Sequence, residues 1–218
     1  MIKVLVADVT PLFNPDTFAK CVCLLCEERL KKVNKLRRTK DKALSAGGWL
    51  LLKKCAACID ENIDIVNIGV YQGGKPYFIN SPHVHFSLSH SGTMAMCAVS
   101  TQNVGADIQN IRTFKDEICK RFFTPTECDY ICESSSSDEK TDRFFEIWTL
   151  KEAYSKMTGG GIGEFSEFDV SEKGIAQLRC DKKVYFHTFA IPQYKLAVCT
   201  GFDGVVNFET VNIMDFIG

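Results

Sequence analysis

The sequence lacks an excess of either charge, because 26 basic side chains stand against 27 acidic ones. No global field therefore favours nucleic acid or an anionic membrane, and any phosphate site must come from local placement of basic residues. The chain also lacks an apolar run of membrane-spanning length, and residues 1–8 lack the basic start of a secretory signal. We therefore expect a cytoplasmic protein that binds neither nucleic acid nor membranes.

Cysteine, in contrast, is plentiful. Eleven cysteines in 218 residues, scattered through apolar segments, fit reduced thiols better than a secreted disulfide framework. The pairs Cys23-x-x-Cys26 and Cys55-x-x-Cys58 could be written as a zinc motif, but Leu-Leu and Ala-Ala fill their gaps and both segments look helical. We expect these thiols to face the core.

An apolar content of 45% is enough for one sizeable domain or two small ones. Apolar periodicity and turn residues predict helices over 16–33, 40–61, 113–123, 126–132 and 143–157. They predict strands over 1–9, 64–71, 77–79, 84–89, 94–100, 104–108, 165–170, 177–180, 183–191 and 195–200. Thr124 is expected to cap the fourth helix, and the polar run 134–142 is expected to be a surface loop.

Two short segments carry most of the chemistry. Residues 104–109 predict an apolar strand that leads into Asp107, and residues 148–156 predict a helix with Glu152 and Lys156 one turn apart on one face. The two carboxylates can share a hard cation such as Mg²⁺, and the lysine can neutralise phosphate charge. Taken singly, a strand-end aspartate and an exposed helix ion pair are the simpler interpretations.

Four motifs occur in order along the chain: Gly74-Lys75-Pro76, Phe86-Ser87-Leu88-Ser89-His90-Ser91-Gly92, Gly105-x-Asp107 and Trp148-x-x-Lys151-Glu152-Ala153-x-x-Lys156. From about Arg29 to the C-terminus, the chain resembles the 4′-phosphopantetheinyl transferases. Its length and motif spacing are similar to the larger Sfp type. One such motif alone is weak evidence, whereas four in order are specific.

The resemblance implies an α+β fold of two similar α/β halves, related by a pseudo-twofold axis, with the active site in the cleft between them. We place the halves at 1–102 and 103–218, where similar apolar strands at 94–99 and 195–200 give a faint internal repeat. It also implies a monomeric enzyme that transfers the phosphopantetheine arm of coenzyme A to a serine of an apo acyl or peptidyl carrier protein, releasing 3′,5′-ADP.

The resemblance assigns Asp107 and Glu152 to Mg²⁺, with Mn²⁺ as the alternative, and places Gln109 as a third ligand. Sfp-type enzymes often have glutamate at this third position, and a neutral amide is a weaker donor for a hard cation. Glu152 is also a candidate general base, although a metal-bound carboxylate is a poor base and a bound water is the alternative. Asp107, Glu152 and Lys156 are thus the expected catalytic residues.

The resemblance also implies a coenzyme A site. It assigns Arg29, Lys32, Ser89 and His90 to the 3′-phosphate, Lys75 and Pro76 to the adenine and phosphates, and Lys156 to the phosphates. By residue type alone, the lysines would be solvated surface charges and the histidine an ordinary polar residue. Lys151 is a further candidate for the cleft-facing side of its helix.

Arg112 and Lys115 follow the Asp107 motif, where relatives meet the carrier protein. The recognition helix of carriers is typically acidic, so both are candidate docking charges, although unpartnered surface charges are the simpler interpretation. Glu127 follows a Phe-rich segment that matches the family, where it could serve the fold or the site.

Two other function classes remain open. A metal-dependent phosphoesterase or nuclease would use the same carboxylates to activate water, and would make Lys75 and the Ser89-His90 pair dispensable. A non-catalytic protein of the same fold would bind coenzyme or carrier without turnover, and Gln109 is the feature that favours it.

Overall fold

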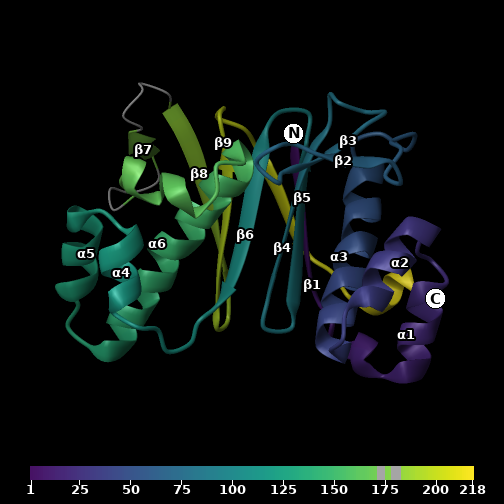
Figure 1. The fold of residues 1–218 in the computed structure, drawn as a ribbon, viewed down its shortest axis with the longest axis horizontal. Helices are drawn as coiled ribbons and strands as arrows, with labels where there is room; N and C mark the ends of the chain where they lie inside the picture. The colour runs from purple at the N-terminus through teal and green to yellow at the C-terminus, as the bar shows by residue number, and fades with distance from the viewer. Residues whose placement is uncertain (171–174, 178–182) are drawn as a thin grey trace.

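The computed structural model describes residues 1–170, 175–177 and 183–218, which form helices packed on two four-stranded sheets (Figure 1). The first sheet has the order β10 (Val206–Thr210), β1 (Ile2–Asp8), β5 (Met94–Ser100) and β4 (His85–Ser91). The second has the order β6 (Val104–Asn110), β9 (Tyr194–Thr200), β8 (Lys183–Ile191) and β7 (Ile175–Gln177). A small hairpin joins β2 (Ile68–Val70) to β3 (Pro76–Phe78).

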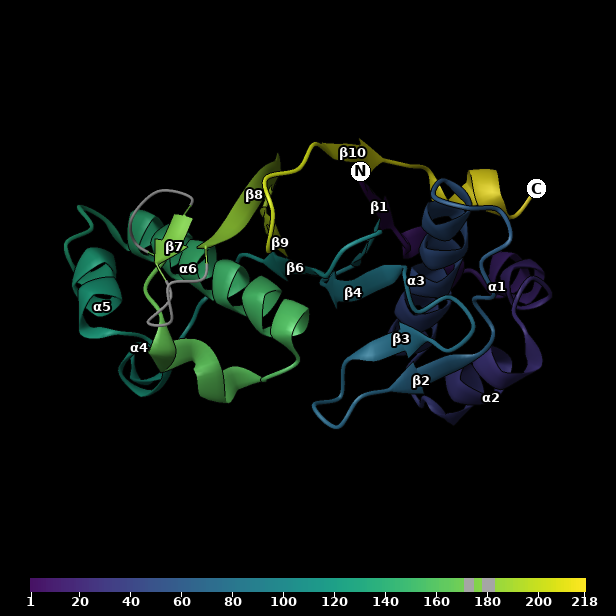
Figure 2. The same cartoon turned by 90° about the horizontal axis from the view of Figure 1, so that it is seen from above.

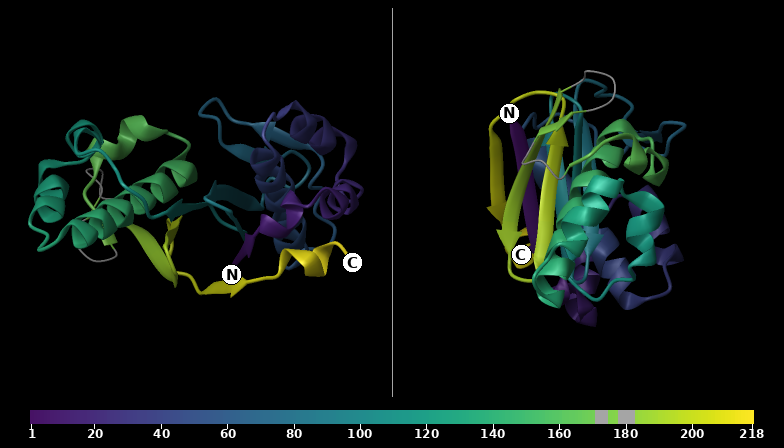
Figure 3. Two further views of the ribbon diagram at one scale, coloured as in Figure 1. Left: turned by 90° about the horizontal axis from the view of Figure 1, so that it is seen from below. Right: turned by 90° about the vertical axis from the view of Figure 1, so that its left-hand side faces the viewer.

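The helices gather on one side of the strands, as Figure 3 (right) shows. They are α1 (Pro15–Val22), α2 (Glu27–Lys35), α3 (Thr39–Ala57), α4 (Glu117–Phe122), α5 (Pro125–Cys132) and α6 (Ser137–Thr158). Short 3₁₀ helices cover Thr10–Phe13, Ile162–Glu167 and Ile213–Phe216. The long helix α3 packs on β1 and β5, and α6 packs on β6 and β9 (Figure 2). No helix among the described residues is long and apolar enough to cross a membrane.

The two sheets meet where β4 lies beside β6, in the middle of Figure 1. Hydroxyls from every second residue of β4 accept hydrogen bonds from every second N–H of β6: Ser87 from Ala106 (2.9 Å), Ser89 from Ile108 (3.3 Å) and Ser91 from Asn110 (2.9 Å). Both strands advance in the same direction along this serine ladder. It therefore joins the two halves through side chains and fixes the register of the strand that carries Asp107.

The end of the chain returns to the first half (Figure 3, left). Strand β10 pairs parallel with β1, from Ile2 opposite Val206 to Val6 opposite Thr210. Beyond it, Ile213 is buried in the apolar core under α3. A separate core lies under α6, and a third apolar cluster combines residues of β1, β5, β6 and β9, so it spans both halves.

The structure confirms much of the expected order of elements and corrects several of them. The expected strands at 94–100 and 183–191 have the observed bounds, and Thr124 caps α5 through a capping box with Glu127. The expected helix 16–33 is broken into α1 and α2 around residues 23–26. The first half of the strand expected at 165–170 belongs to the 3₁₀ helix Ile162–Glu167, and the loop expected at 134–142 contains the start of α6. The expected strand 177–180 falls mostly outside the described residues.

The two CxxC pairs differ from the expectation of core thiols. Cys55 is buried and Cys26 is half-buried, but Cys23 and Cys58 are exposed. No group of three or more histidine, cysteine or acidic side chains is placed to hold a metal within the described part of the chain. The pairs therefore give no sign of a zinc site there.

Candidate active site

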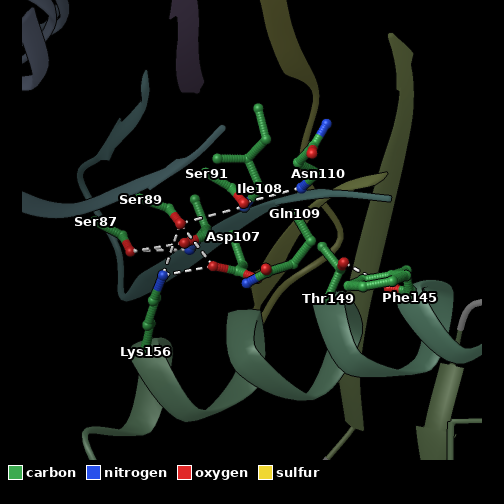
Figure 4. Close-up of polar contacts among 11 residues, drawn as sticks. Ser87, Ser89, Ser91, Asp107, Ile108, Gln109, Asn110, Phe145, Thr149 and Lys156 are labelled. Atoms are coloured by element: carbon green, nitrogen blue, oxygen red, sulfur yellow. Dashed lines mark hydrogen bonds and ion pairs between the residues drawn. The ribbon is translucent and has the colours of Figure 1, made fainter. Parts of the chain in front are cut away.

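The candidate site forms where β6 presses against α6. A Cβ atom on Gly105 would lie 2.0 Å from the carbonyl oxygen of Ala153 and 2.4 Å from the amide nitrogen of Met157. Only a residue without a side chain permits this approach. The contact sets Asp107, two residues along β6, against Lys156 on the adjacent turn of α6 (Figure 4).

The Asp107 carboxylate is buried, and both of its oxygens accept hydrogen bonds (Figure 4). Its Oδ1 accepts from Ser89 Oγ at 2.6 Å and from Lys156 Nζ at 2.6 Å. Its Oδ2 accepts from Gln109 Nε2 at 2.9 Å. Charge-assisted hydrogen bonds of this kind hold an anion firmly in a protein interior, so the residues of three motifs converge on one carboxylate.

Glu152 is the second acidic group of the site. Its side chain is half-buried, and burial together with the nearby Asp107 charge raises its pKa, while Lys156 opposes that shift. Gln109 and Glu152 line one pocket together. The carboxylates of Asp107 and Glu152 and the Oε1 atom of Gln109 are all oxygen donors, which is the set that a hard divalent cation prefers. The residues present therefore fit such an ion, with two charged ligands and one neutral one.

A groove leads from Lys156, at the edge of this carboxylate centre, to the first half. One part is lined by Arg29, Lys32 and Pro76, and the next by Lys75, Pro76 and Lys156; Phe86 and Leu88 line both. Basic side chains from α2 and α6 thus border a continuous groove with apolar walls. Such a groove suits a ligand that combines phosphate groups with a flat, poorly solvated part.

Arg29 is anchored at the wall of this groove. Its Nη2 donates to the carbonyl oxygen of Ser45 at 2.6 Å and to Ser45 Oγ at 2.7 Å, and its guanidinium lies 5.4 Å from the centre of the Trp49 ring. Its Nε is buried and has no hydrogen-bond partner among the residues that the structure describes. Desolvation lowers the Arg29 pKa, and the unpartnered Nε shows that the group retains capacity for an acceptor.

Lys75 lies at the groove, but its ammonium points across it to the second half. Nζ donates to the Met157 carbonyl oxygen at 2.6 Å, to the Val104 carbonyl oxygen at 3.3 Å and to the Asn103 side chain. Burial lowers its pKa to about 8. The amine therefore clamps the C-terminal end of α6 in this structure, and it would have to leave these acceptors to reach a phosphate.

Ser89 and His90 point in opposite directions from β4. Ser89 is buried in the Asp107 network, where its hydroxyl also accepts from Lys156 Nζ at 2.8 Å. His90 is exposed, although surrounding protein atoms and the nearby Lys156 charge lower the pKa of its ring. The structure therefore places Ser89 with the carboxylate centre rather than on an open phosphate surface.

Lys151 does not face the cleft, which corrects the expectation for this side of α6. It is fully buried, with Nζ 2.9 Å from Glu127 Oε1 and 2.7 Å from the carbonyl oxygen of Phe168. Burial lowers the pKa of the lysine and raises that of Glu127. The pair connects α6, which carries the site, to α5 through Glu127 and to the segment after α6 through Phe168. Removing one partner would leave the other as an unpaired buried charge, which is strongly destabilising.

Arg112 and Lys115 line the Gln109 and Glu152 pocket, together with aromatic residues that include Phe114 and Trp148. Phe114 stacks on Phe144 with ring centres 3.9 Å apart. The pocket is therefore an apolar depression with basic residues at its edge, next to the carboxylate centre.

Comparisons with known proteins find relatives of one family. A family model described as the 4′-phosphopantetheinyl transferase superfamily (ACPS) matches residues 103–200, which include Asp107, Glu152 and Lys156. A 4′-phosphopantetheinyl transferase of Bacillus subtilis is 34% identical over 141 residues, and 4′-phosphopantetheinyl transferase Sfp of Bacillus subtilis (strain 168) is 33% identical over 141 residues. Each match covers 62% of this chain and 62% of the relative.

A longer match extends over nearly the whole chain. 4′-Phosphopantetheinyl transferase gsp of Aneurinibacillus migulanus is 27% identical over 222 residues, which cover 98% of this chain and 92% of that relative. The similarity therefore includes the first half, which supplies the groove residues, as well as the second half, which supplies the carboxylates.

Proposed function

We propose that this chain, which belongs to the 4′-phosphopantetheinyl transferase superfamily, transfers the phosphopantetheine arm of coenzyme A to a serine of an apo acyl or peptidyl carrier protein. The observation that carries the proposal is the junction of the Asp107, Glu152 and Lys156 centre with a basic groove that starts at Arg29 and Lys32. A carboxylate centre alone would serve many phosphate reactions, but the groove adds a place for a large phosphorylated substrate.

In the proposed reaction, the carrier serine oxygen forms a bond to the phosphorus that bears the pantetheine arm. The bond from that phosphorus to the leaving phosphate breaks, and 3′,5′-ADP departs with the electron pair. Glu152, or a water that it orients, accepts the serine proton. Lys156 neutralises phosphate charge in the groove.

A divalent ion, Mg²⁺ with Mn²⁺ as the alternative, would be held by Asp107 and Glu152 with Gln109 Oε1 as a third oxygen, and would neutralise pyrophosphate charge when bound. Arg29 and Lys32 would bind phosphate at the far end of the groove, with Pro76 beside the adenine and His90 near the phosphates. The pocket with Arg112 and Lys115 would receive the acidic helix of the carrier next to Glu152.

We also propose that the halves 1–102 and 103–218 are related by a pseudo-twofold axis, and that the enzyme acts as a cytoplasmic monomer. Each half has one long helix packed on strands of its own, α3 on β1 and β5 and α6 on β6 and β9, which supports the axis; β10 from the second half completes the first sheet. A site built from both halves of one chain supports the monomer, because no second copy is needed to complete it.

The test is to incubate the protein with coenzyme A, Mg²⁺ and a panel of apo carriers, and to measure the carrier masses. We expect at least one carrier to gain one phosphopantetheine group and an equal amount of 3′,5′-ADP to appear. Release of 3′,5′-ADP without a carrier would instead favour a phosphoesterase. Binding of coenzyme A with no product on any carrier would favour the non-catalytic alternative.

A further inference from the structure

Lys156 forms an ion pair with Asp107, so its ammonium group is not free to bind a phosphate in this structure. Its Nζ lies 2.6 Å from Asp107 Oδ1 and 2.8 Å from Ser89 Oγ (Figure 4). The Asp107 side chain is 1% exposed, whereas that of Lys156 is 30% exposed. The carboxylate is therefore fixed in the protein, and the lysine reaches it from the solvent side.

Both oxygens of Asp107 are already bonded. Ser89 and Lys156 donate to Oδ1, and Gln109 donates to Oδ2. Oδ1 accepts two hydrogen bonds, so a divalent ion that binds Oδ1 must displace a donor, whereas Oδ2 accepts only one. At either oxygen, the positive charge of Lys156 opposes a second cation. Metal binding and the Lys156 contact therefore compete for one carboxylate.

Lys156 also lines the basic groove between Lys75, Ser87 and the end of α6. Its long, flexible side chain can exchange the carboxylate for an anion in that groove while its backbone stays in place. An anion there would release Asp107 and supply the negative charge that the lysine loses.

We propose that Lys156 is the resident counter-ion of Asp107 in the ligand-free protein, and that phosphates in the groove draw it away to open the carboxylate to a divalent ion. The second part rests on the proposed function, because it takes coenzyme A as the source of the phosphates. Since coupling between two ligands is reciprocal, the coenzyme then tightens metal binding and the metal tightens coenzyme binding.

The first measurement needs no coenzyme. Free Mn²⁺ is followed by electron paramagnetic resonance while the full-length protein is titrated, and the wild type is compared with Lys156→Met. We expect Mn²⁺ to bind the variant about tenfold more tightly, which corresponds to about 1.4 kcal/mol, because no internal cation competes. Equal or weaker binding by the folded variant would overturn the proposal.

The matched control is Lys140→Met. Lys140 Nζ lies 2.7 Å from Asp116 Oδ2, and its exposure of 30% equals that of Lys156. It lies on α6 about three turns before Glu152, so we expect the Mn²⁺ affinity of this variant to equal that of the wild type. Circular dichroism checks the fold, and Lys156→Gln replaces Lys156→Met if the latter does not fold; a gain in Mn²⁺ affinity is expected in either.

The second measurement adds coenzyme A at saturation, with a titration of coenzyme A alone to subtract the Mn²⁺ that its own phosphates hold. We expect coenzyme A to tighten Mn²⁺ binding to the wild type by more than it does for Lys156→Met. If coenzyme A increased the Mn²⁺ affinity of the wild type and of Lys156→Met by the same factor, the proposed release of Lys156 by phosphate would be overturned. No binding of coenzyme A to the wild type would overturn the proposed function, while the first measurement would still decide whether Lys156 is the counter-ion.

Discussion

Gly105 and Ala153 approach so closely that a Cβ atom on the glycine would lie 2.0 Å from the alanine carbonyl oxygen. This contact holds β6 against α6, and through them Asp107 against Lys156. The geometry of the site therefore depends on a residue that has no functional group.

Gly105→Ala tests this dependence. The methyl group must push α6 away, so we expect a loss of about 1–3 kcal/mol in the free energy of unfolding and an almost complete loss of transfer. Urea unfolding and carrier mass measure the two effects. Gly163→Ala is the control, because a Cβ there meets no atom within 4 Å; similar losses in both variants would contradict the prediction.

Asp107→Asn removes a charge while keeping the shape of the side chain. We expect transfer to fall by about 10²-fold or more, because the site loses an anionic ligand that cannot be replaced by an amide. The fold should persist, since the amide oxygen can still accept from Ser89. The rate of carrier modification at saturating Mg²⁺ is the measurement, and wild-type activity in this variant would remove Asp107 from the site.

Gln109→Glu should have opposite effects with and without metal. Without metal it replaces the donor to Asp107 Oδ2 by a like charge, so we expect a loss of about 1.5–3 kcal/mol in stability. With metal, the added anionic oxygen should tighten binding. Thermal unfolding over a range of Mg²⁺ concentrations measures both, with the exposed Gln102→Glu as control. Metal affinity that does not rise would place Gln109 outside the coordination shell.

Lys75 allows a test by pH. Burial lowers its pKa from 10.5 to about 8, so between these values the unfolded chain holds a proton that the folded protein has released. Stability rises with pH wherever the unfolded state binds more protons, so this group contributes a rise over that interval. We expect Lys75→Met to lose this contribution, whereas the exposed Lys40→Met keeps it. The measurement is the urea midpoint of unfolding as a function of pH over this interval. The same dependence on pH in the wild type, Lys75→Met and Lys40→Met would contradict the burial of the Lys75 amine.

Arg112→Glu probes the carrier. Reversing one exposed charge should raise the KM for the carrier by about fivefold and leave the KM for coenzyme A unchanged. Charges at an interface edge mainly steer the encounter, and screening limits their reach to about 8 Å at physiological ionic strength. Added salt should therefore slow the wild type more than the variant. Parallel loss of rate in both would exclude docking through Arg112.

The elements that carry the site could be predicted because their signals are local. The apolar strand before Asp107 and the helix stop at Gly159, which adopts φ 83°, are both visible in short windows of sequence. The start of α6 also has a local signal, although the serine-rich composition around it predicts a loop. Ser136 accepts a hydrogen bond from the amide of Glu139, and Asp138 and Glu139 occupy the first turn, which is a typical helix start.

Other features depend on contacts between distant residues, which a local pattern does not contain. No local pattern predicts strand β10, because its partner β1 is about 200 residues away in the sequence. The hydrogen-bond and ion-pair partners of Lys75 and Lys151 could not be predicted for the same reason, since other segments of the chain supply them. Residue type indicated that these lysines carry charge, and only packing determines which groups neutralise it.

The parallel pairing of β1 with β10 has a consequence for folding during synthesis. The β1 edge that β10 covers leaves the ribosome early, and its partner, Val206–Thr210, is made only after both sheets have otherwise been synthesised. Until then, one side of β1 exposes unpaired backbone groups that can pair with other chains. Contacts of such long sequence separation form slowly, so this nascent protein passes through an interval in which its first sheet is open to aggregation or to binding by a chaperone.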